Sequence, residues 1–390
     1  MTLSRRNFLG RSLAIGCSAA ASPLLTPVTF ASTPGDARLV VIVLRGAMDG
    51  LDVVRPYGDP DYATHRPTLS QTGFDDLDGF FGLHESLAPL MPLWGKGELA
   101  FAHAVSTPYR NKRSHFDGQD MLENGAGSSD GQLTDARDGW LNRALAGIPG
   151  AHVKTAFAVG RENLLLLSGD AEHSSWSPEA ALELSPQGEL LLNAIYAQDP
   201  LFHDAAMQAL ELSELTETDG MNARRAGRAD ALAGFAASRL REDSRIAAFS
   251  LTGWDTHANQ ANALPRALDQ LRIAIETLKD GLGPDWDKTL VMGITEFGRT
   301  VRENGSRGTD HGTGGAAIFA GGALNGGRVF GDWPGLGQGD LFQDRDLMPS
   351  ADVRSYAGWA LHSLMGLPTS MIERDVFPGL ELGRSPGLIS

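Results

Sequence analysis

Acidic and imidazole side chains recur directly after apolar runs at several widely separated places in the chain. The residues concerned are Asp49, Asp52, Asp255, His257, Glu296, Asp310 and His311. Mixed Asp, Glu and His ligands suit Zn²⁺ or another divalent first-row metal, and Mg²⁺ or Ca²⁺ is favoured where oxygen ligands dominate. We therefore predict that these seven side chains bind a divalent metal. Two such ions close together would stabilise the attacking and leaving oxygens of a phosphoryl or sulfuryl transfer.

A second group of chemically active residues lies in a basic loop and at the helix start that follows it. Ser114 is placed to cap that helix, and Ser114 and His115 are the predicted catalytic pair. His115 and Thr107 are alternatives to Ser114 as the nucleophile. The helix dipole favours an anion at this position. The predicted substrate-binding cations are Arg110, Lys112, Arg113 and Arg299.

Each of these features also has a purely structural explanation. Asp-Gly and Asp-His-Gly segments are common in tight turns, where the Asp side chain accepts backbone hydrogen bonds. Glu296 and Arg299 are spaced to form an ion pair at a helix start, and Ser114 would serve as a cap without any catalytic role. The functional interpretation rests on the coincidence of several such sites at the same position relative to a strand.

The elements that would position these residues are visible as apolar runs. Continuous β-branched or apolar stretches at 38–44, 99–105, 245–250 and 289–294 predict buried strands, and helical spacing is present at 83–94 and 264–278. Side chains that follow the carboxyl ends of parallel strands meet at one edge of the sheet. The pattern therefore predicts an α/β fold with a doubly wound, mostly parallel sheet and a site at that edge.

The middle of the chain has a different character. Between residues 139 and 241, Gly, Pro and Ser punctuate short segments before a long stretch rich in Ala, Leu and Arg. We predict that this range is a helical cap or insertion within a single domain spanning residues 32–390. A hydrophobic content of 42% is enough for one large α/β domain of this length.

The N-terminal segment has the features of an export signal. Arg5 and Arg6 precede Phe8 and a weakly apolar run up to residue 31, which predicts a cleavable twin-arginine signal over residues 1–31. An uncleaved anchor, or lipid attachment at Cys17, is the alternative. The signal implies the twin-arginine export machinery as a partner and a periplasmic or extracellular location, with no transmembrane segment in the mature chain.

Charge and cysteine content exclude several classes of function. Cleavage after residue 31 removes three arginines and no acid, which leaves 30 basic and 48 acidic residues and a net charge of −18. Such a surface repels nucleic acid. The one cysteine lies inside the signal, so the mature chain has no disulfide and no thiol catalysis.

Taken together, the motifs resemble a known family. The runs around Asp49, Ser114, Asp255, Glu296 and Asp310 resemble the exported family called domain of unknown function 1501, over nearly the whole chain. That family is similar to the alkaline phosphatase and sulfatase superfamily. The resemblance implies an alkaline phosphatase-like fold with metal sites at the carboxyl edge of the sheet.

The resemblance also implies roles for individual residues. Asp49 matches the first-strand ligand, Ser114 lies near the nucleophile, and Asp255 with His257 matches the mid-chain ligand pair. Glu296 matches the strand-end acid, and Asp310 with His311 matches the late motif that carries a histidine.

Three functions follow as hypotheses. The first is an exported metal-dependent hydrolase of phosphate or sulfate esters that acts on a small anionic ester substrate. The second is a non-catalytic secreted binding or assembly module on the same fold, because Glu296-Phe297 stands where the superfamily usually has Asp-His. The third, a cofactor-dependent oxidoreductase, lacks the glycine-rich dinucleotide signature.

Overall fold

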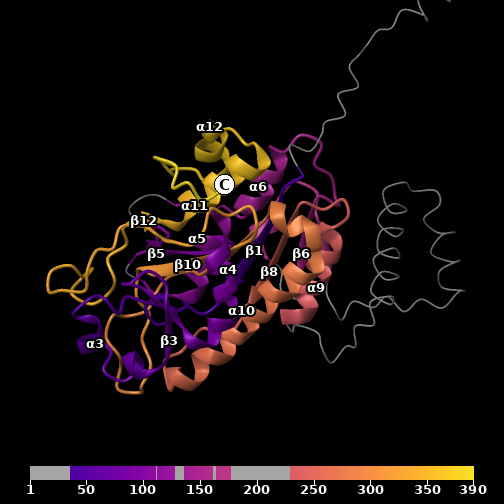
Figure 1. The fold of residues 1–390 in the computed structure, drawn as a ribbon. Helices are drawn as coiled ribbons and strands as arrows, with labels where there is room; N and C mark the ends of the chain where they lie inside the picture. The colour runs from indigo at the N-terminus through magenta and orange to yellow at the C-terminus, as the bar shows by residue number, and fades with distance from the viewer. Residues whose placement is uncertain (1–35, 111, 128–135, 161–163, 177–228) are drawn as a thin grey trace, which may run out of the picture.

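A nine-stranded sheet forms the centre of the fold (Figure 1). The computed structural model describes residues 36–110, 112–127, 136–160, 164–176 and 229–390. Within them the strand order is β11-β5-β10-β9-β1-β8-β6-β7, with β12 also paired to β5. The strands are β1 (Arg38–Leu44), β5 (Leu99–Ser106), β6 (Ala156–Val159), β7 (Ser174–Trp176), β8 (Ile246–Leu251), β9 (Thr289–Ile294), β10 (Gly315–Ala320), β11 (Val329–Phe330) and β12 (Ala351–Asp352).

The sheet is mostly parallel. β1 pairs in parallel with both β8 and β9, and β6 pairs in parallel with β7 and β8. Among the described strands of this sheet, β10 alone runs against its neighbours, β5 and β9. The α/β fold with a mostly parallel sheet is therefore confirmed.

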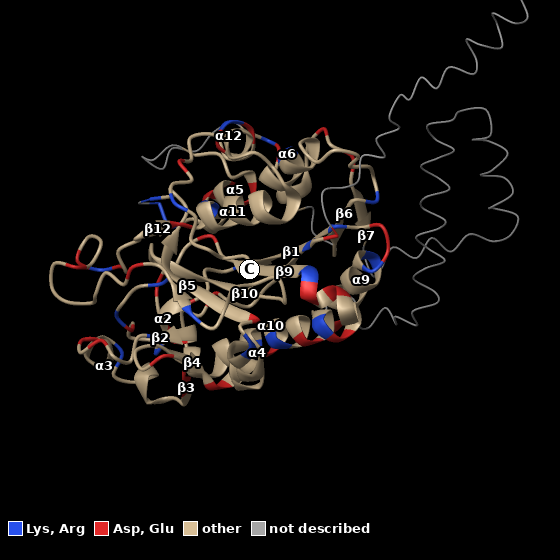
Figure 2. Cartoon of the chain, turned by 45° about the horizontal axis from the view of Figure 1, so that its top comes forward, with Lys and Arg blue, Asp and Glu red and all other residues tan. Residues whose placement is uncertain are grey.

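Helices cover both faces of the sheet, which makes it doubly wound (Figure 2). Every residue of β1 is buried, because its odd-numbered side chains pack under α6 and α11 and its even-numbered ones pack under α9 and α10. This explains the continuous apolar run, which is typical of a strand buried on both faces. The helices are α2 (Gly50–Val53), α3 (Tyr62–His65), α4 (Met91–Lys96), α5 (His115–Asn124), α6 (Trp140–Ala146), α9 (Ala229–Leu240), α10 (Gln260–Leu282), α11 (Val353–Met365) and α12 (Thr369–Met371).

One expected helix is wrong in its extent. Residues 83–94 begin in strand β4 (Gly82–His84) and continue as a 3₁₀ helix over Glu85–Leu90 before α4. Pro89 lies inside the 3₁₀ segment and Pro92 in the first turn of α4. Proline lacks the backbone N–H that an α-helix interior requires, which accounts for the division. β4 instead joins β2 (Val54–Arg55) and β3 (Phe74–Asp76) in a small antiparallel sheet.

The range 139–241 differs from the predicted cap in the parts that the structure describes. α6 packs in the core on one face of the main sheet, β6 and β7 extend that sheet, and α9 packs beside α10 on the other face. These elements belong to the central domain. The remainder of the predicted cap, residues 177–228, lies outside the described residues, as does the predicted signal at 1–31.

The described helices include none that is both long and apolar enough to cross a bilayer.

His103 on β5 gives the fold a pH dependence that is separate from the site. Its Nε2 donates to the Val54 carbonyl oxygen (2.9 Å), and its Nδ1 accepts from the Ala104 amide (2.9 Å). Burial lowers the pKa of His103 to about 4. The unfolded chain therefore takes up this proton first, near pH 6.5, and the folded state loses stability as the pH falls from about 6.5 to about 4.

Replacing His103 by glutamine should remove this dependence. We expect the wild-type protein to lose up to about 3 kcal/mol of unfolding free energy between pH 7 and pH 4 through this group, and His103→Gln to lose correspondingly less. Urea unfolding of both proteins across that range measures the difference. Parallel pH profiles for the two proteins would contradict the assignment.

Candidate metal centre

Three segments meet at one edge of the sheet and bring their polar side chains together. His115 begins α5 after β5, and Asp255 and His257 follow β8. His311 lies just before β10. Because β10 is antiparallel to its neighbours, its first residues lie at the edge where the other strands end. Side chains that are nearly 200 residues apart in sequence therefore become neighbours.

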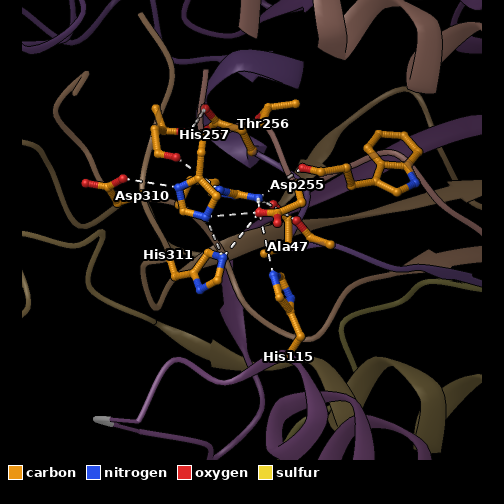
Figure 3. Close-up of polar contacts among 12 residues, drawn as sticks. Ala47, His115, Asp255, Thr256, His257, Asp310 and His311 are labelled. Atoms are coloured by element: carbon orange, nitrogen blue, oxygen red, sulfur yellow. Dashed lines mark hydrogen bonds and ion pairs between the residues drawn. The ribbon is translucent and has the colours of Figure 1, made fainter. Parts of the chain in front are cut away.

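The Oδ1 atom of Asp255 is the common contact of these groups (Figure 3). It lies 3.1 Å from Nε2 of His257, 3.2 Å from Nε2 of His311 and 3.5 Å from Nε2 of His115. The Nε2 atoms of His257 and His311 are 2.9 Å apart. We call His115, Asp255, His257 and His311 the Asp255 cluster.

Each imidazole of the Asp255 cluster is held by an acceptor at its other nitrogen. The Nδ1 contacts are His115 to Glu296 Oε1 (2.8 Å), His257 to Asp310 Oδ1 (3.1 Å) and His311 to the Arg113 carbonyl oxygen (2.9 Å). A carbonyl or an ionised carboxylate can only accept, so each of these Nδ1 contacts requires a hydrogen on Nδ1. A neutral ring has one hydrogen for its two nitrogens, so with that hydrogen on Nδ1 the Nε2 atom faces the Asp255 carboxylate with a lone pair and cannot donate to it. A cation between Nε2 and Asp255 would satisfy both.

This donor set fits a divalent metal. Three neutral imidazoles and one carboxylate are ligands that Zn²⁺ prefers, and histidine ligands are typically oriented by an acceptor at the second nitrogen. Ligand atoms of His115, Asp255 and His311 all lie within 4.8 Å of one another. His257 is not part of that group of three, and its Nε2 contacts Asp255 and His311. Nε2 of His115 is buried and has no hydrogen-bond partner among the described residues. A cation at this point would satisfy it.

One side of the Asp255 cluster faces solvent. The side chains of Asp255 and His257 are 47% and 43% exposed, whereas that of His311 is 18% exposed. A metal held here would keep a side open to a substrate, as catalytic zinc sites do and closed structural sites do not.

The electrostatics of the site keep its carboxylates ionised and shift the pKa values of two of its histidines in opposite directions. The hydrogen bond to Glu296 raises the pKa of His115, whereas burial lowers the pKa of His311. Burial alone would raise the pKa of Glu296, but the hydrogen bonds from His115, Gln119 and backbone amides together lower it. Burial opposes the negative form of Asp255 in the same way, and Arg299 together with His311 and His257 lowers its pKa overall.

Arg299 is buried and holds the loops of the site together. Its buried guanidinium donates to carbonyl oxygens of Gly46 (2.6 Å), Ala47 (2.8 Å) and Thr309 (3.0 Å), and to Asp255 Oδ1 (2.5 Å). Its side chain is 0% exposed. This corrects the prediction of Arg299 as an anion-binding residue: all its visible contacts tie the loops after β1 and β8 to the loop before β10.

The predicted ligands Asp49 and Asp52 lie outside the Asp255 cluster. Asp49 Oδ2 accepts from Arg66 (2.7 Å) and Gln260 (2.6 Å), and Asp52 Oδ1 accepts from Arg55 (2.7 Å). Buried arginines therefore take the place that the sequence analysis gave to a metal. The other oxygen of Asp49, Oδ1, is buried and makes no hydrogen bond to a described residue.

Glu296 and Asp310 reach the site, but as partners of histidines. Glu296 Oε1 is hydrogen-bonded to Nδ1 of His115 and also accepts from the Gly46 amide (2.9 Å) and Gln119 (3.2 Å). Asp310 binds Nδ1 of His257. Both residues thus orient histidines, a role different from the direct metal binding predicted for them.

The basic loop contributes mainly through its backbone. Arg113 forms an ion pair with Asp346 (3.1 Å), and Lys112 is exposed and lies 3.7 Å from Asp117. Ser114 caps α5, with its Oγ accepting from the Asp117 amide (3.4 Å). Its helix-capping position is as predicted.

The rival nucleophile Thr107 is buried, and its Oγ1 accepts from the Tyr109 amide (3.3 Å). Ser114 is partly exposed and adjoins His115, so it is the more accessible of the two hydroxyls.

Several supporting residues gave no signal in the sequence. Gln119, Gln260, Arg66 and Asn304 each bind a carboxylate of the site region through their side chains. Amide and guanidinium groups occur throughout the chain, so their type and spacing do not mark them. Their roles follow only from the approach of distant loops.

Comparison with known proteins assigns the chain to a family. Residues 36–373 match the model described as "Protein of unknown function (DUF1501)". The chain belongs to this family. The DUF1501 family was the one that its motifs resembled. No curated protein matches the chain in sequence.

Solved structures similar to this DUF1501 chain are distant in sequence. The lipooligosaccharide phosphoethanolamine transferase A (EptA) from Neisseria meningitidis is 13% identical, with a TM-score of 0.41 over 95% of this chain and 64% of that one. The lipoteichoic acid synthase LtaP from Listeria monocytogenes is 11% identical, with a TM-score of 0.36 over 91% of this chain and 74% of that one. A Vibrio parahaemolyticus protein in the alkaline phosphatase superfamily is 14% identical, with a TM-score of 0.32 over 89% of this chain and 71% of that one. The DUF1501 chain thus spans less than two thirds of the Neisseria protein.

The backbone at Gly46 leaves no room for a side chain. Its φ is +123°, and an added Cβ would lie 2.6 Å from the Asp255 amide nitrogen. Gly46→Ala should therefore displace the loop that carries Asp255. We expect it to weaken zinc binding, measured by competition with a chromophoric chelator, by at least about tenfold, the effect typical of disturbing the support of a metal ligand.

Gly253→Ala is the matched control for Gly46→Ala. Gly253 also has a positive φ, +100°, but an added Cβ would meet nothing closer than 3.9 Å. Gly253→Ala should therefore lose about 1–2 kcal/mol of stability through backbone strain and keep most of its zinc affinity. Equal losses of affinity in the two variants would contradict the role assigned to Gly46.

Proposed function

We propose that this DUF1501 chain is a divalent-metal-dependent hydrolase of phosphate or sulfate esters. The observation that carries the proposal is the Asp255 cluster, in which three imidazoles turn their Nε2 atoms toward one carboxylate while acceptors hold each Nδ1. A purely structural ion-pair network has no need of three imidazoles that converge on one carboxylate. A solvent-exposed side, a donor set suited to Zn²⁺ and a nearby hydroxyl support hydrolysis.

The chain's own residues would divide the work as follows. His115, Asp255, His257 and His311 would hold the metal, which supplies Lewis-acid polarisation of the ester oxygen. Ser114, immediately before His115, offers a hydroxyl for attack on the ester. Lys112 is exposed on the same loop and would attract the anion. Glu296 and Asp310 would keep the histidines in the binding tautomer.

The proposed site of action is outside the cytoplasm. The twin-arginine motif at Arg5 and Arg6 supports export through the twin-arginine machinery to the periplasm or beyond. An export route that carries folded proteins would suit an enzyme whose metal ligands come from three separate segments of the chain.

A second candidate function is a non-catalytic binding module with a structural metal. The pairing of Asp49 with Arg66 and of Asp52 with Arg55 favours it, because these carboxylates are already neutralised and give no second metal site. Turnover, rather than metal content, separates the two candidates.

Removing one imidazole tests the hydrolase directly. We expect the wild-type chain to carry about one equivalent of metal and to hydrolyse an aryl phosphate or aryl sulfate. His257→Ala should reduce both metal content, by elemental analysis, and turnover by at least about 100-fold, since a ligand is lost outright. His152→Ala is the control, because His152 is exposed and its Nδ1 accepts from the Lys154 amide.

The outcomes discriminate between the candidates. Metal lost in His257→Ala together with lost turnover supports the hydrolase. Bound metal without turnover on any phosphate or sulfate ester favours the binding module. Ester hydrolysis that persists in metal-free His257→Ala would show that the Asp255 cluster is not the active site.

Metal binding should also stabilise the fold, because the unfolded chain does not bring these four residues together. We expect Zn²⁺ at 100 times its dissociation constant to raise the unfolding free energy by about 2.7 kcal/mol. Thermal unfolding of the chelator-treated chain, with and without Zn²⁺, measures the shift. His311→Ala should unfold at the same temperature in both conditions, and an equal zinc shift in that variant would refute the assignment of ligands.

A further inference from the structure

A cavity of about 450 Å³ lies near the ends of β5 and β12, and the first residues of the basic loop that leads to His115 form part of its lining. Its volume is in the range of small-molecule sites. It is formed by the segment after β5, the start of α11 and the C-terminal segment. The residues that matter for its chemistry are Pro108, Arg110, Asp352, Arg354, Leu380 and Glu381.

Two of the four charges in this cavity cancel each other. Arg354 and Asp352 form a two-pronged ion pair, with Nε–Oδ1 and Nη2–Oδ2 distances of 3.1 and 2.8 Å. Nη1 of Arg354 donates to the Gly125 carbonyl oxygen (3.0 Å). Since the guanidinium is satisfied and buried, this pair forms a fixed, neutral wall of the cavity.

Arg110 is different because it has no carboxylate partner. Its Nη1 donates to Ser106 Oγ (2.9 Å) and to the carbonyl oxygens of Thr107 (2.5 Å) and Tyr109 (2.8 Å), which fix its orientation. It forms no ion pair with any described residue, and its Nε and Nη2 make no hydrogen bond yet are not sealed from solvent. Phe342 lies under the guanidinium at 5.9 Å. A half-buried, preoriented cation with free N–H groups is a binding site for an anion.

Glu381 supplies the opposite charge. It lines the same cavity, is exposed, and its carboxylate forms neither an ion pair nor a hydrogen bond with a described residue. After the Arg354–Asp352 pair is discounted, the uncompensated groups of the cavity are one cation, Arg110, and one anion, Glu381. Leu380 and Pro108 provide apolar surface alongside.

We propose that this cavity binds a small zwitterion, with its acidic group on Arg110 and its ammonium group on Glu381. The site is separate from the Asp255 cluster, and its ligands do not include a metal. A molecule with both charges neutralises both side chains, whereas a simple anion would leave Glu381 uncompensated and nearby. The cavity therefore discriminates by charge pattern as well as by size.

Taurine and β-alanine are suitable probes, with ethanesulfonate as the anion that lacks an ammonium group. Binding is measured by ligand-observed NMR on the full chain after chelator treatment and dialysis, so that no metal competes for the acidic group. Because neither metal nor turnover enters this measurement, its result is independent of the proposed hydrolase activity.

Two variants separate the two charges. Arg110→Gln should weaken binding of all three probes by about 10- to 100-fold, the loss that corresponds to a charge-assisted hydrogen bond. Glu381→Gln should weaken taurine and β-alanine by at least about fivefold and leave ethanesulfonate unchanged or slightly tighter. Arg384→Gln, which removes an exposed cation three residues after Glu381 and outside the cavity lining, should leave all three unchanged.

The proposal is overturned if neither taurine nor β-alanine binds the wild-type chain, or if Arg384→Gln reduces binding as much as Arg110→Gln does. It is also overturned if Glu381→Gln affects ethanesulfonate and taurine alike. Glu381 is exposed and makes no polar contact with a described residue, so its replacement keeps the test valid even if Arg110→Gln disturbs the loop.

Discussion

The orientation of three histidine rings is the constraint on which the site depends. Each ring of the Asp255 cluster can bind a cation through Nε2 only while Nδ1 keeps its hydrogen, and an acceptor that is fixed by the fold secures this in each case. Those acceptors, Glu296, Asp310 and the Arg113 carbonyl, are themselves held by other contacts. Loss of any one of these acceptors would let its histidine ring turn or change tautomer, even though all four residues of the Asp255 cluster would still be present.

Buried arginines make the supporting structure rigid. Arg55, Arg66 and Arg299 are completely buried, and each combines a carboxylate with backbone carbonyl oxygens as acceptors. An unpaired charge at such depth would cost several kcal/mol, so these contacts must all form together. The result is that the loops after β1, β8 and β9 have one arrangement relative to one another. Arg299 also lowers the pKa of Asp255, which keeps that carboxylate ionised for a cation.

The sequence was informative where a residue's environment is set by its own strand. The runs at β1 and β9 lie within the predicted bounds because a strand buried on both faces is continuously apolar, and the meeting of loops at the carboxyl edge follows from parallel pairing. It was uninformative where partners come from elsewhere. Asp49 and Glu296 both follow central strands, yet one faces Arg66 and the other faces His115. Only the tertiary approach of those partners decides which carboxylate serves the site.

The most direct test is zinc K-edge X-ray absorption on the full chain loaded with one equivalent of Zn²⁺. The account predicts a first shell of nitrogen and oxygen atoms with the multiple-scattering signature of three imidazoles, reduced to two in His115→Ala. A shell of oxygens alone, or a three-imidazole signature that persists in His115→Ala, would contradict the Asp255 cluster as the metal centre.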